Sequence, residues 1–179
     1  MSSCVYLRIP SEQLVLMLRI EWPDLKHHED FMSADYYAPF LDKVKSMVTD
    51  DANALTVNHI HATPPLSAVS SKAPVVEMLL LYVDLSANDE VPGTIMRFMD
   101  ILSKNAVGFV ATTHGWVVEE MEKEGSDGKF KGYFVAIGWE SVEAHMEYRE
   151  TEAFKESIPM LRALAKGLKV VSSSTALNL

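Results

Sequence analysis

The hydrophobic positions of residues 74–174 follow first the spacing of strands and then that of helices, in a regular order. Residues 74–86 are β-branched and aliphatic, as in a buried strand, and residues 91–105 carry apolar side chains at helical spacing. The later pattern predicts a strand at 109–121, a glycine-containing hairpin loop at 123–131, a strand at 132–139, a helix capped by Ser141 and a strand at 168–174. The order β-α-β-β-α-β predicts an α+β protein with a split βαβ arrangement.

A partial copy of this unit precedes it. Residues 16–47 align without gaps on residues 133–164 at a constant offset of 117. The aligned pairs are Trp22 and Trp139, Leu25 and Val142, His28 and His145, Phe31 and Tyr148, Tyr37 and Phe154, Leu41 and Ile158, and Val44 and Leu161. These positions first alternate and then recur every three or four residues, which predicts a strand that runs into an amphipathic helix in both copies. A strand follows each helix, at 55–61 and at 168–174.

The repeat predicts two domains. We expect a truncated ferredoxin-like half at residues 1–65, a linker at 66–73, a complete ferredoxin-like half at 74–175 and a tail at 176–179. The first half begins with short strands near 5–9 and 13–21, so we expect it to lack the initial strand and helix of the unit.

Composition narrows the class of protein. With 179 residues, 48% of them hydrophobic, the chain can build a core. A net charge of -9 and the lack of a Lys/Arg stripe disfavour nucleic acid and anionic membranes as partners. The single cysteine, Cys4, excludes an intramolecular disulfide and a thiolate metal cluster. No apolar run reaches the roughly 20 residues of a membrane span, and no signal peptide is visible, so we expect a cytoplasmic protein.

The sequence contains no Gly-x-Gly-x-x-Gly, Walker, Gly-x-Ser-x-Gly or His-Glu-x-x-His pattern. Nucleotide-dependent, serine hydrolase and zincin chemistries are therefore excluded, and we expect neither a cofactor nor a metal. Six histidines leave proton transfer near neutral pH as the chemistry that the chain can perform.

The run Gly-Trp-Glu-Ser-Val-Glu-Ala-His at 138–145 places a tryptophan at the end of the third strand and a histidine in the following helix. This arrangement resembles the dimeric α+β barrel superfamily, in particular its antibiotic-biosynthesis-monooxygenase-like and polyketide-cyclase-like members. The resemblance covers residues 75–171 and, in degenerate form, 13–61. It implies an apolar pocket between each sheet and its helices, and a pseudo-dimer of the two halves. The missing strand leaves an open edge that a second chain could cover, so we expect a homodimer.

The resemblance implies a cofactor-independent enzyme of specialised metabolism that acts on a hydrophobic polyketide-like or aromatic substrate. Acid/base chemistry would make it a cyclase, isomerase, dehydratase or decarboxylase. Two alternatives remain open at this point. One is a cofactor-free monooxygenase of a phenolic substrate, and the other is a non-catalytic ligand-binding or stress-response protein.

His114 is the leading candidate for the catalytic base. It alternates with Thr112 and Trp116 along the strand at 109–121, and it lies in the implied pocket if that strand face looks at the helices. Tyr82 or His145 would polarise the substrate carbonyl. The alternative for His114 is a structural histidine hydrogen-bonded within the sheet.

Other polar and aromatic residues are candidates for the pocket lining. His59 and His61 lie two apart on one strand, about 7 Å from each other, but no third metal ligand is evident. Glu77 lies within an apolar strand, where it pairs with a cation, lies between sheets or has a raised pKa. The predicted substrate-binding residues are Trp116, Trp139, Phe98, Met78, Phe154, His59 and His61.

Overall fold

The computed structural model describes residues 2–8, 15–46, 55–87, 89–123 and 125–174. The chain divides into two compact units, Met1–His61 and Ala62–Leu179, here called the first and second unit. The tail predicted at 176–179 lies outside the described residues. Within the described part of the chain, no helix is long and apolar enough to cross a membrane.

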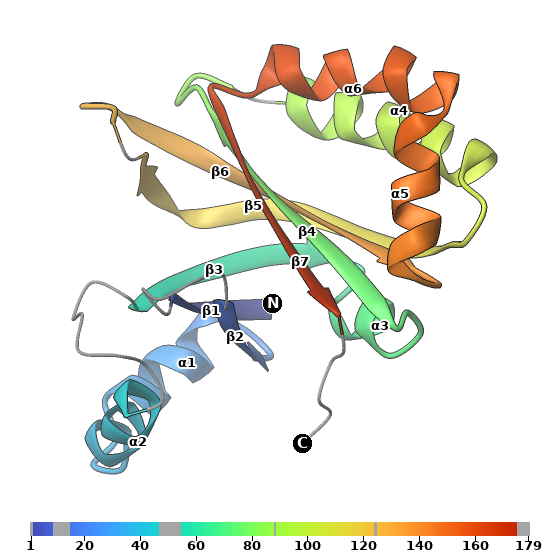
Figure 1. Cartoon of the computed structure of the whole chain (residues 1–179). Coiled ribbons are helices and arrows are strands. Elements are labelled where there is room, and N and C mark those ends of the chain that lie inside the picture. The colour runs from blue at the N-terminus through green and yellow to red at the C-terminus, as the bar shows by residue number, and fades with distance from the viewer. Residues whose placement is uncertain (1, 9–14, 47–54, 88, 124, 175–179) are drawn as a thin grey trace. The chain divides into compact units, whose positions relative to one another are not determined.

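The second unit contains the complete β-α-β-β-α-β order. Its elements are β4 (Val75–Val83), α4 (Glu90–Asn105), β5 (Phe109–Glu122), β6 (Lys129–Trp139), α5 (Val142–Glu150), α6 (Glu152–Leu164) and β7 (Gly167–Ser174). The strands are antiparallel and lie in the order β5-β6-β4-β7 (Figure 1). This is the ferredoxin-like topology, so the predicted fold class is confirmed.

The helices α4, α5 and α6 cover one face of this sheet (Figure 1). The odd-numbered apolar residues of β4 and β6 point to that face, because successive side chains alternate along a strand. Each large apolar side chain that is fully buried there contributes about 1.5–3 kcal/mol. The core against the helices comprises Val75, Leu79, Leu81, Val83, Val91, Ile95, Phe98, Met99, Leu102, Tyr133, Val135, Ile137, Trp139, Tyr148 and Leu161.

The second helical segment is divided in two. Ser141 caps α5 as predicted, because its hydroxyl oxygen accepts from the Ala144 N–H at 3.1 Å. Thr151 has extended backbone geometry and ends α5, and its hydroxyl oxygen accepts from the Phe154 N–H at 3.2 Å to begin α6. The predicted single helix is therefore two helices joined by one capping residue.

The segment predicted as a linker is ordered structure of the second unit. It contains the short helix α3 (Ser67–Ser70), and its apolar residues Leu66, Val69 and Ala73 are buried. Glycine at position 138 of β6 permits this close packing, since a Cβ there would lie 2.5 Å from the Ala73 Cβ. The serines and prolines of this segment obscured its three buried apolar residues, which are spaced three or four apart.

The described residues of the first unit form three strands and two helices. They are β1 (Ser2–Arg8), β2 (Val15–Glu21), α1 (Leu25–Met32), α2 (Tyr37–Lys45) and β3 (Leu55–Thr63). β1 pairs antiparallel with both β2 and β3, so it is the central strand of these three.

The position of β1 corrects the predicted truncation. Ser3 of β1 pairs with Ile20, and Glu77 of β4 pairs with Ile137, which is the residue aligned with Ile20. β1 pairs with β2 and β3, just as β4 pairs with β6 and β7. β1 is therefore the equivalent of β4. The described residues of the first unit therefore include an initial strand, but no helix equivalent to α4 and no strand equivalent to β5. A direct connection can replace those elements because the first and third strands of this topology are antiparallel neighbours.

Candidate functional site

The helix-facing surface of β5 and β6 carries the candidate site. His114 pairs with Val135 and Trp116 pairs with Tyr133, and both partners belong to the core against the helices. Residues directly opposite in a sheet share a face, so His114 and Trp116 lie on the helix-facing side. Both side chains are half-buried on β5, the outer strand of the unit's own sheet. The sequence left open whether the face of this strand that carries His114 looks toward the helices. The strand pairing shows that it does.

His114 and Tyr133 form the central contact of this surface. Nδ1 of His114 lies 2.8 Å from the Tyr133 hydroxyl oxygen, and the two rings stack with centroids 5.9 Å apart. Burial lowers the pKa of His114 and raises the pKa of Tyr133 to about 12. At neutral pH the imidazole is therefore uncharged and the phenol is protonated.

The protonation of His114 decides what it can do. When Nδ1 carries the proton and donates it to the Tyr133 oxygen, the lone pair on Nε2 is left to accept another proton. Among the described residues, Nε2 has no hydrogen-bond partner. This arrangement fits a general base held in place through its other nitrogen.

Two further side chains complete the group. Trp116 packs edge-on against Tyr133 with ring centroids 4.8 Å apart. The Lys131 ammonium lies 5.6 Å from the centre of the Trp116 ring and donates to the Ala87 carbonyl oxygen at 3.0 Å. We call His114, Trp116, Lys131 and Tyr133 the helix-facing cluster. Sequence analysis did not single out Lys131 or Tyr133, although both share the alternation of Val135 along β6.

Tyr82 and Met78 lie on the opposite face of the sheet. Met78 pairs with Ala136 and is buried, while Tyr82 pairs with Gly132 and packs edge-on against Phe130 at 6.1 Å. Burial raises the pKa of Tyr82. The structure therefore does not bring Tyr82 to His114, because even-numbered residues of β4 point away from the helices.

His145 lies at the other end of the sheet from His114. Its ring stacks on Trp139 with centroids 5.1 Å apart, and its Nε2 lies 3.3 Å from the Glu77 carboxylate. The Trp139 indole N–H donates to the same carboxylate oxygen at 3.4 Å. Along β6, Trp139 is six residues from Tyr133, or about 20 Å. His145 thus belongs to a buried group separate from His114. Of the three roles predicted for Glu77, this contact with an ionisable side chain fits pairing with a cation.

The first unit repeats this buried group with a different partner. His28 stacks on Trp22 with centroids 5.1 Å apart, and its Nδ1 lies 2.5 Å from Nε2 of His59. His59 is buried, whereas His61, two residues further along β3, is exposed. In the described part of the chain no group of three or more His, Cys, Asp or Glu side chains could hold a metal ion.

The other predicted lining residues belong to the core. Phe98 of α4 and Trp139 are buried, and half-buried Phe154 packs edge-on against Tyr148 at 5.6 Å. Side chains therefore fill the space between sheet and helices near these residues. Of the predicted aromatic residues, Trp116 is the one that lies beside His114.

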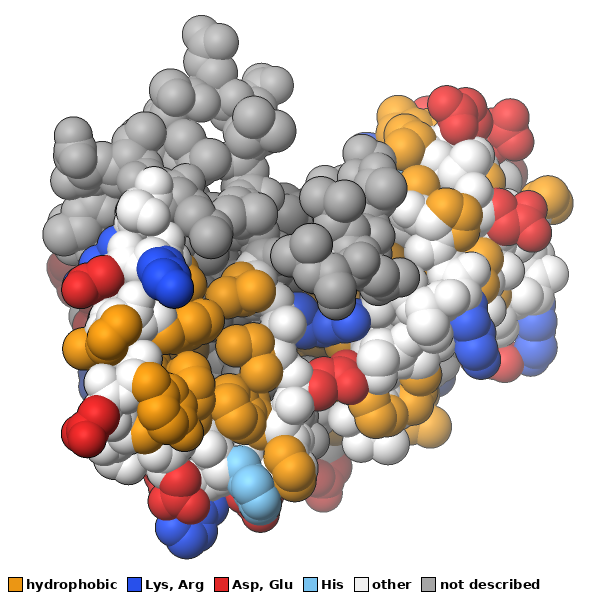
Figure 2. All heavy atoms as spheres, turned by 90° about the horizontal axis from the view of Figure 1, so that it is seen from below, with side chains coloured by type: hydrophobic (Ala, Val, Ile, Leu, Met, Phe, Trp, Pro, Cys, Tyr) orange, Lys and Arg blue, Asp and Glu red, His pale blue; other side chains and the backbone are white. Residues whose placement is uncertain are grey.

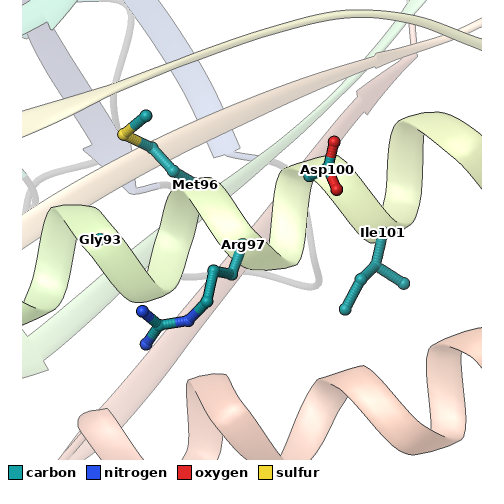
Figure 3. Close-up of a pocket in the computed structure, with 5 residues that line it drawn as sticks. All are labelled: Gly93, Met96, Arg97, Asp100 and Ile101. Carbon is teal, nitrogen blue, oxygen red and sulfur yellow. The ribbon is translucent and has the colours of Figure 1, made fainter.

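Two surface depressions lie outside the helix-facing cluster. One, of about 540 Å³, is lined by Gly93, Met96, Arg97, Asp100 and Ile101 on the outer side of α4. Figure 3 shows Met96 and Asp100 projecting to one side of this helix and Arg97 and Ile101 to the other. The second, of about 360 Å³, is lined by residues from the end of β4, the start of α4 and the end of α6, and includes Ala87. Lys131 donates a hydrogen bond to the carbonyl of Ala87 but is not itself among the residues that line this depression.

Comparison with known proteins supports the fold. No family model and no curated protein matches the chain. The chain is similar to the crystal structure of an anthrone oxidase-like protein, with a TM-score of 0.62 and 17% identity over 100% of this chain and 82% of the other.

Two further solved structures are described as candidate monooxygenases. The protein from Fusobacterium nucleatum has a TM-score of 0.58 and 11% identity over 94% of this chain and 72% of its own. The protein from Lactobacillus acidophilus has a TM-score of 0.53 and 12% identity over 96% and 74%. At such identities the similarity shows the fold alone, which is the ferredoxin-like α+β fold that the sequence predicted. A fold alone does not determine the reaction.

Proposed function

We propose that this protein is a cofactor-independent enzyme that removes a proton from a hydrophobic aromatic or polyketide-like small molecule. The observation that carries the proposal is the hydrogen bond between His114 and Tyr133 on a half-buried surface, with Nε2 of the imidazole without a described partner. The similarity to an anthrone oxidase-like protein and to candidate monooxygenases supports an enzyme of small molecules.

In this proposal Nε2 of His114 accepts a proton from an acidic C–H or O–H bond of the substrate. Tyr133 holds the imidazole through Nδ1, and Trp116 offers its ring to an aromatic substrate. The electron pair of the broken bond stays on the substrate as an enolate or phenolate. Such an anion can then cyclise, isomerise, or lose water or carbon dioxide.

Oxygenation is the second candidate, and the similarity to an anthrone oxidase-like protein favours it. The carbanion made by His114 would react with dioxygen. An activated methylene then becomes a carbonyl, one oxygen atom enters the product and the other leaves as water, so the four electrons lost by carbon reduce one dioxygen molecule. No cofactor is required for this balance.

Turnover of anthrone and polycyclic phenols, measured in air and under nitrogen with an oxygen electrode, tests both candidates. We expect His114→Gln to lower turnover by a factor on the order of 100. The matched control is His27→Gln, which changes an exposed histidine of α1. Dependence on air selects oxygenation, and turnover under nitrogen selects the proton-transfer reactions. Full activity of His114→Gln would contradict the proposal.

We also propose that the protein is a homodimer that forms through the first unit. In that unit, no described strand pairs with the outer edge of β2, because the equivalent of β5 is missing. Exposed strand edges favour pairing with another chain. Met32, the last residue of α1, and Tyr36, just before α2, are 37% and 62% exposed. Figure 2 shows the molecule from the side where these helices lie, with apolar side chains gathered among charged ones.

Sedimentation velocity tests the dimer. A species of twice the chain mass of 20.0 kDa is expected. Tyr36→Glu places a charge among the exposed apolar side chains and should lower the dimer fraction. A monomer at all concentrations would contradict the proposal.

A further inference from the structure

Lys131 is the cation of the helix-facing cluster. It lies two residues before Tyr133 on β6, so both side chains point to the same face. Its ammonium lies over the Trp116 ring at 5.6 Å and donates one hydrogen bond, to the neutral carbonyl of Ala87. The side chain is half-buried.

No ion pair is described for Lys131. Glu120, the residue opposite it on β5, binds Lys129 instead, with 3.2 Å between nitrogen and oxygen. An ammonium has three N–H donors, and the Ala87 carbonyl accepts one of them. Donors are therefore left to bind a ligand beside the Trp116 ring.

The surroundings favour an anion at this position. The ammonium is partly shielded from water, so its attraction for a negative charge is stronger than that of a fully exposed lysine. The chain as a whole carries a net charge of -9, which repels anions from most of its surface.

We propose that Lys131 binds the anionic oxygen of the substrate while a ring of that substrate lies against Trp116. This inference rests on the proposed function, in which His114 removes the proton. The C–H proton moves to Nε2 of His114. The electron pair of the broken C–H bond is delocalised through the conjugated rings onto the substrate oxygen, where the Lys131 ammonium stabilises the negative charge. No covalent bond forms to lysine.

The spacing of the two residues defines the length of the substrate. His114 pairs with Val135, which is four residues from Lys131 along β6, or about 13 Å. A molecule that reaches both residues must be elongated. The substrate class is therefore a fused-ring phenol or enol whose ionised oxygen lies at one end and whose acidic hydrogen lies toward the other.

A coloured phenol makes the test independent of turnover. The probe is a monohydroxyanthraquinone, whose absorption changes on ionisation, and its methyl ether is the neutral control. We expect the wild-type protein to lower the pKa of the bound phenol by about one unit relative to buffer. Lys131→Met keeps the apolar stem without the charge and should abolish the shift, with about tenfold weaker binding of the phenolate. Lys131→Arg should retain the shift.

The controls separate the outcomes. Circular dichroism and thermal unfolding of Lys131→Met establish that the variant is folded. Unchanged phenolate affinity in folded Lys131→Met, equal losses for phenol and methyl ether, or no binding of either probe to the wild type would overturn the proposal. If His114→Gln keeps full turnover, the proposed function fails. The pKa shift of the bound phenol still reports on Lys131, because it does not require proton transfer to His114.

Discussion

The imidazole of His145 stacks on the indole of Trp139 with ring centroids 5.1 Å apart and an interplanar angle of 30°. Trp22 and His28, the aligned pair of the first unit, stack at 5.1 Å and 20°. The contact recurs although the residue that binds each histidine differs, Glu77 in one unit and His59 in the other. A contact kept in both units while its partner changes indicates packing of the helix on the sheet rather than catalysis.

Removing the acceptor in the second unit should destabilise the protein. Glu77→Leu leaves both the Trp139 N–H and His145 without the carboxylate that they share. We expect a loss of about 1–3 kcal/mol in the free energy of unfolding, measured with urea. Glu77→Gln keeps an acceptor oxygen and should lose less. Equal losses for the two variants would show that the hydrogen bonds contribute nothing.

A double-mutant cycle tests the histidine pair of the first unit. Either His28→Leu or His59→Leu removes the contact between the two buried imidazoles, and each should cost about 1–3 kcal/mol of unfolding free energy. The double variant should cost less than the sum, because both polar groups are removed together. Exposed His61→Gln is the control and should change stability by less than about 0.5 kcal/mol. Strict additivity would show that the two rings do not interact.

The segment that contains α3 packs on β6, and this packing depends on Gly138. In Gly138→Ala the new Cβ would lie 2.5 Å from the Ala73 Cβ and 3.0 Å from a Val69 methyl, so this segment must shift. We expect a loss of about 1–3 kcal/mol by urea unfolding. Gly128→Ala in the hairpin loop is the matched control, since its nearest neighbours are 4.0 Å away. Equal stability of the two variants would contradict this close contact.

Most of the fold could be predicted from the sequence because its signals are local. Hydrophobic spacing located the strands and helices of the second unit, and the alignment of Trp22 with Trp139 revealed the repeat. The missing elements of the first unit could not be identified in this way. The equivalence of β1 and β4 appears in strand pairing, such as that of Ser3 with Ile20, and not in the residue types of the two strands.

The site was predicted less completely because it depends on register. The pairing of Glu120 with Lys131, continued regularly, would place Trp116 opposite Val135. A register shift between Trp116 and Glu120 places Tyr133 there instead. His114 could be selected from its chemistry and its alternation along the strand. Tyr133 and Lys131 could not, because no local pattern reveals the shift of two residues that places Tyr133, rather than Val135, opposite Trp116.

The pH dependence of His114 follows from its burial, which lowers its pKa below the value of about 6.5 for a solvated imidazole. The unfolded chain therefore binds the proton first as pH falls below about 6.5. The contribution of this group to stability is complete above that pH and is lost as pH falls through the folded-state pKa. Turnover should accordingly stay level from pH 8 to about 6.5 and decline below, where the protonated imidazole cannot act as a base. NMR titration of the imidazole, assigned with His114→Gln, measures this pKa directly. A midpoint at or above about 6.5 would show that burial does not favour the neutral base.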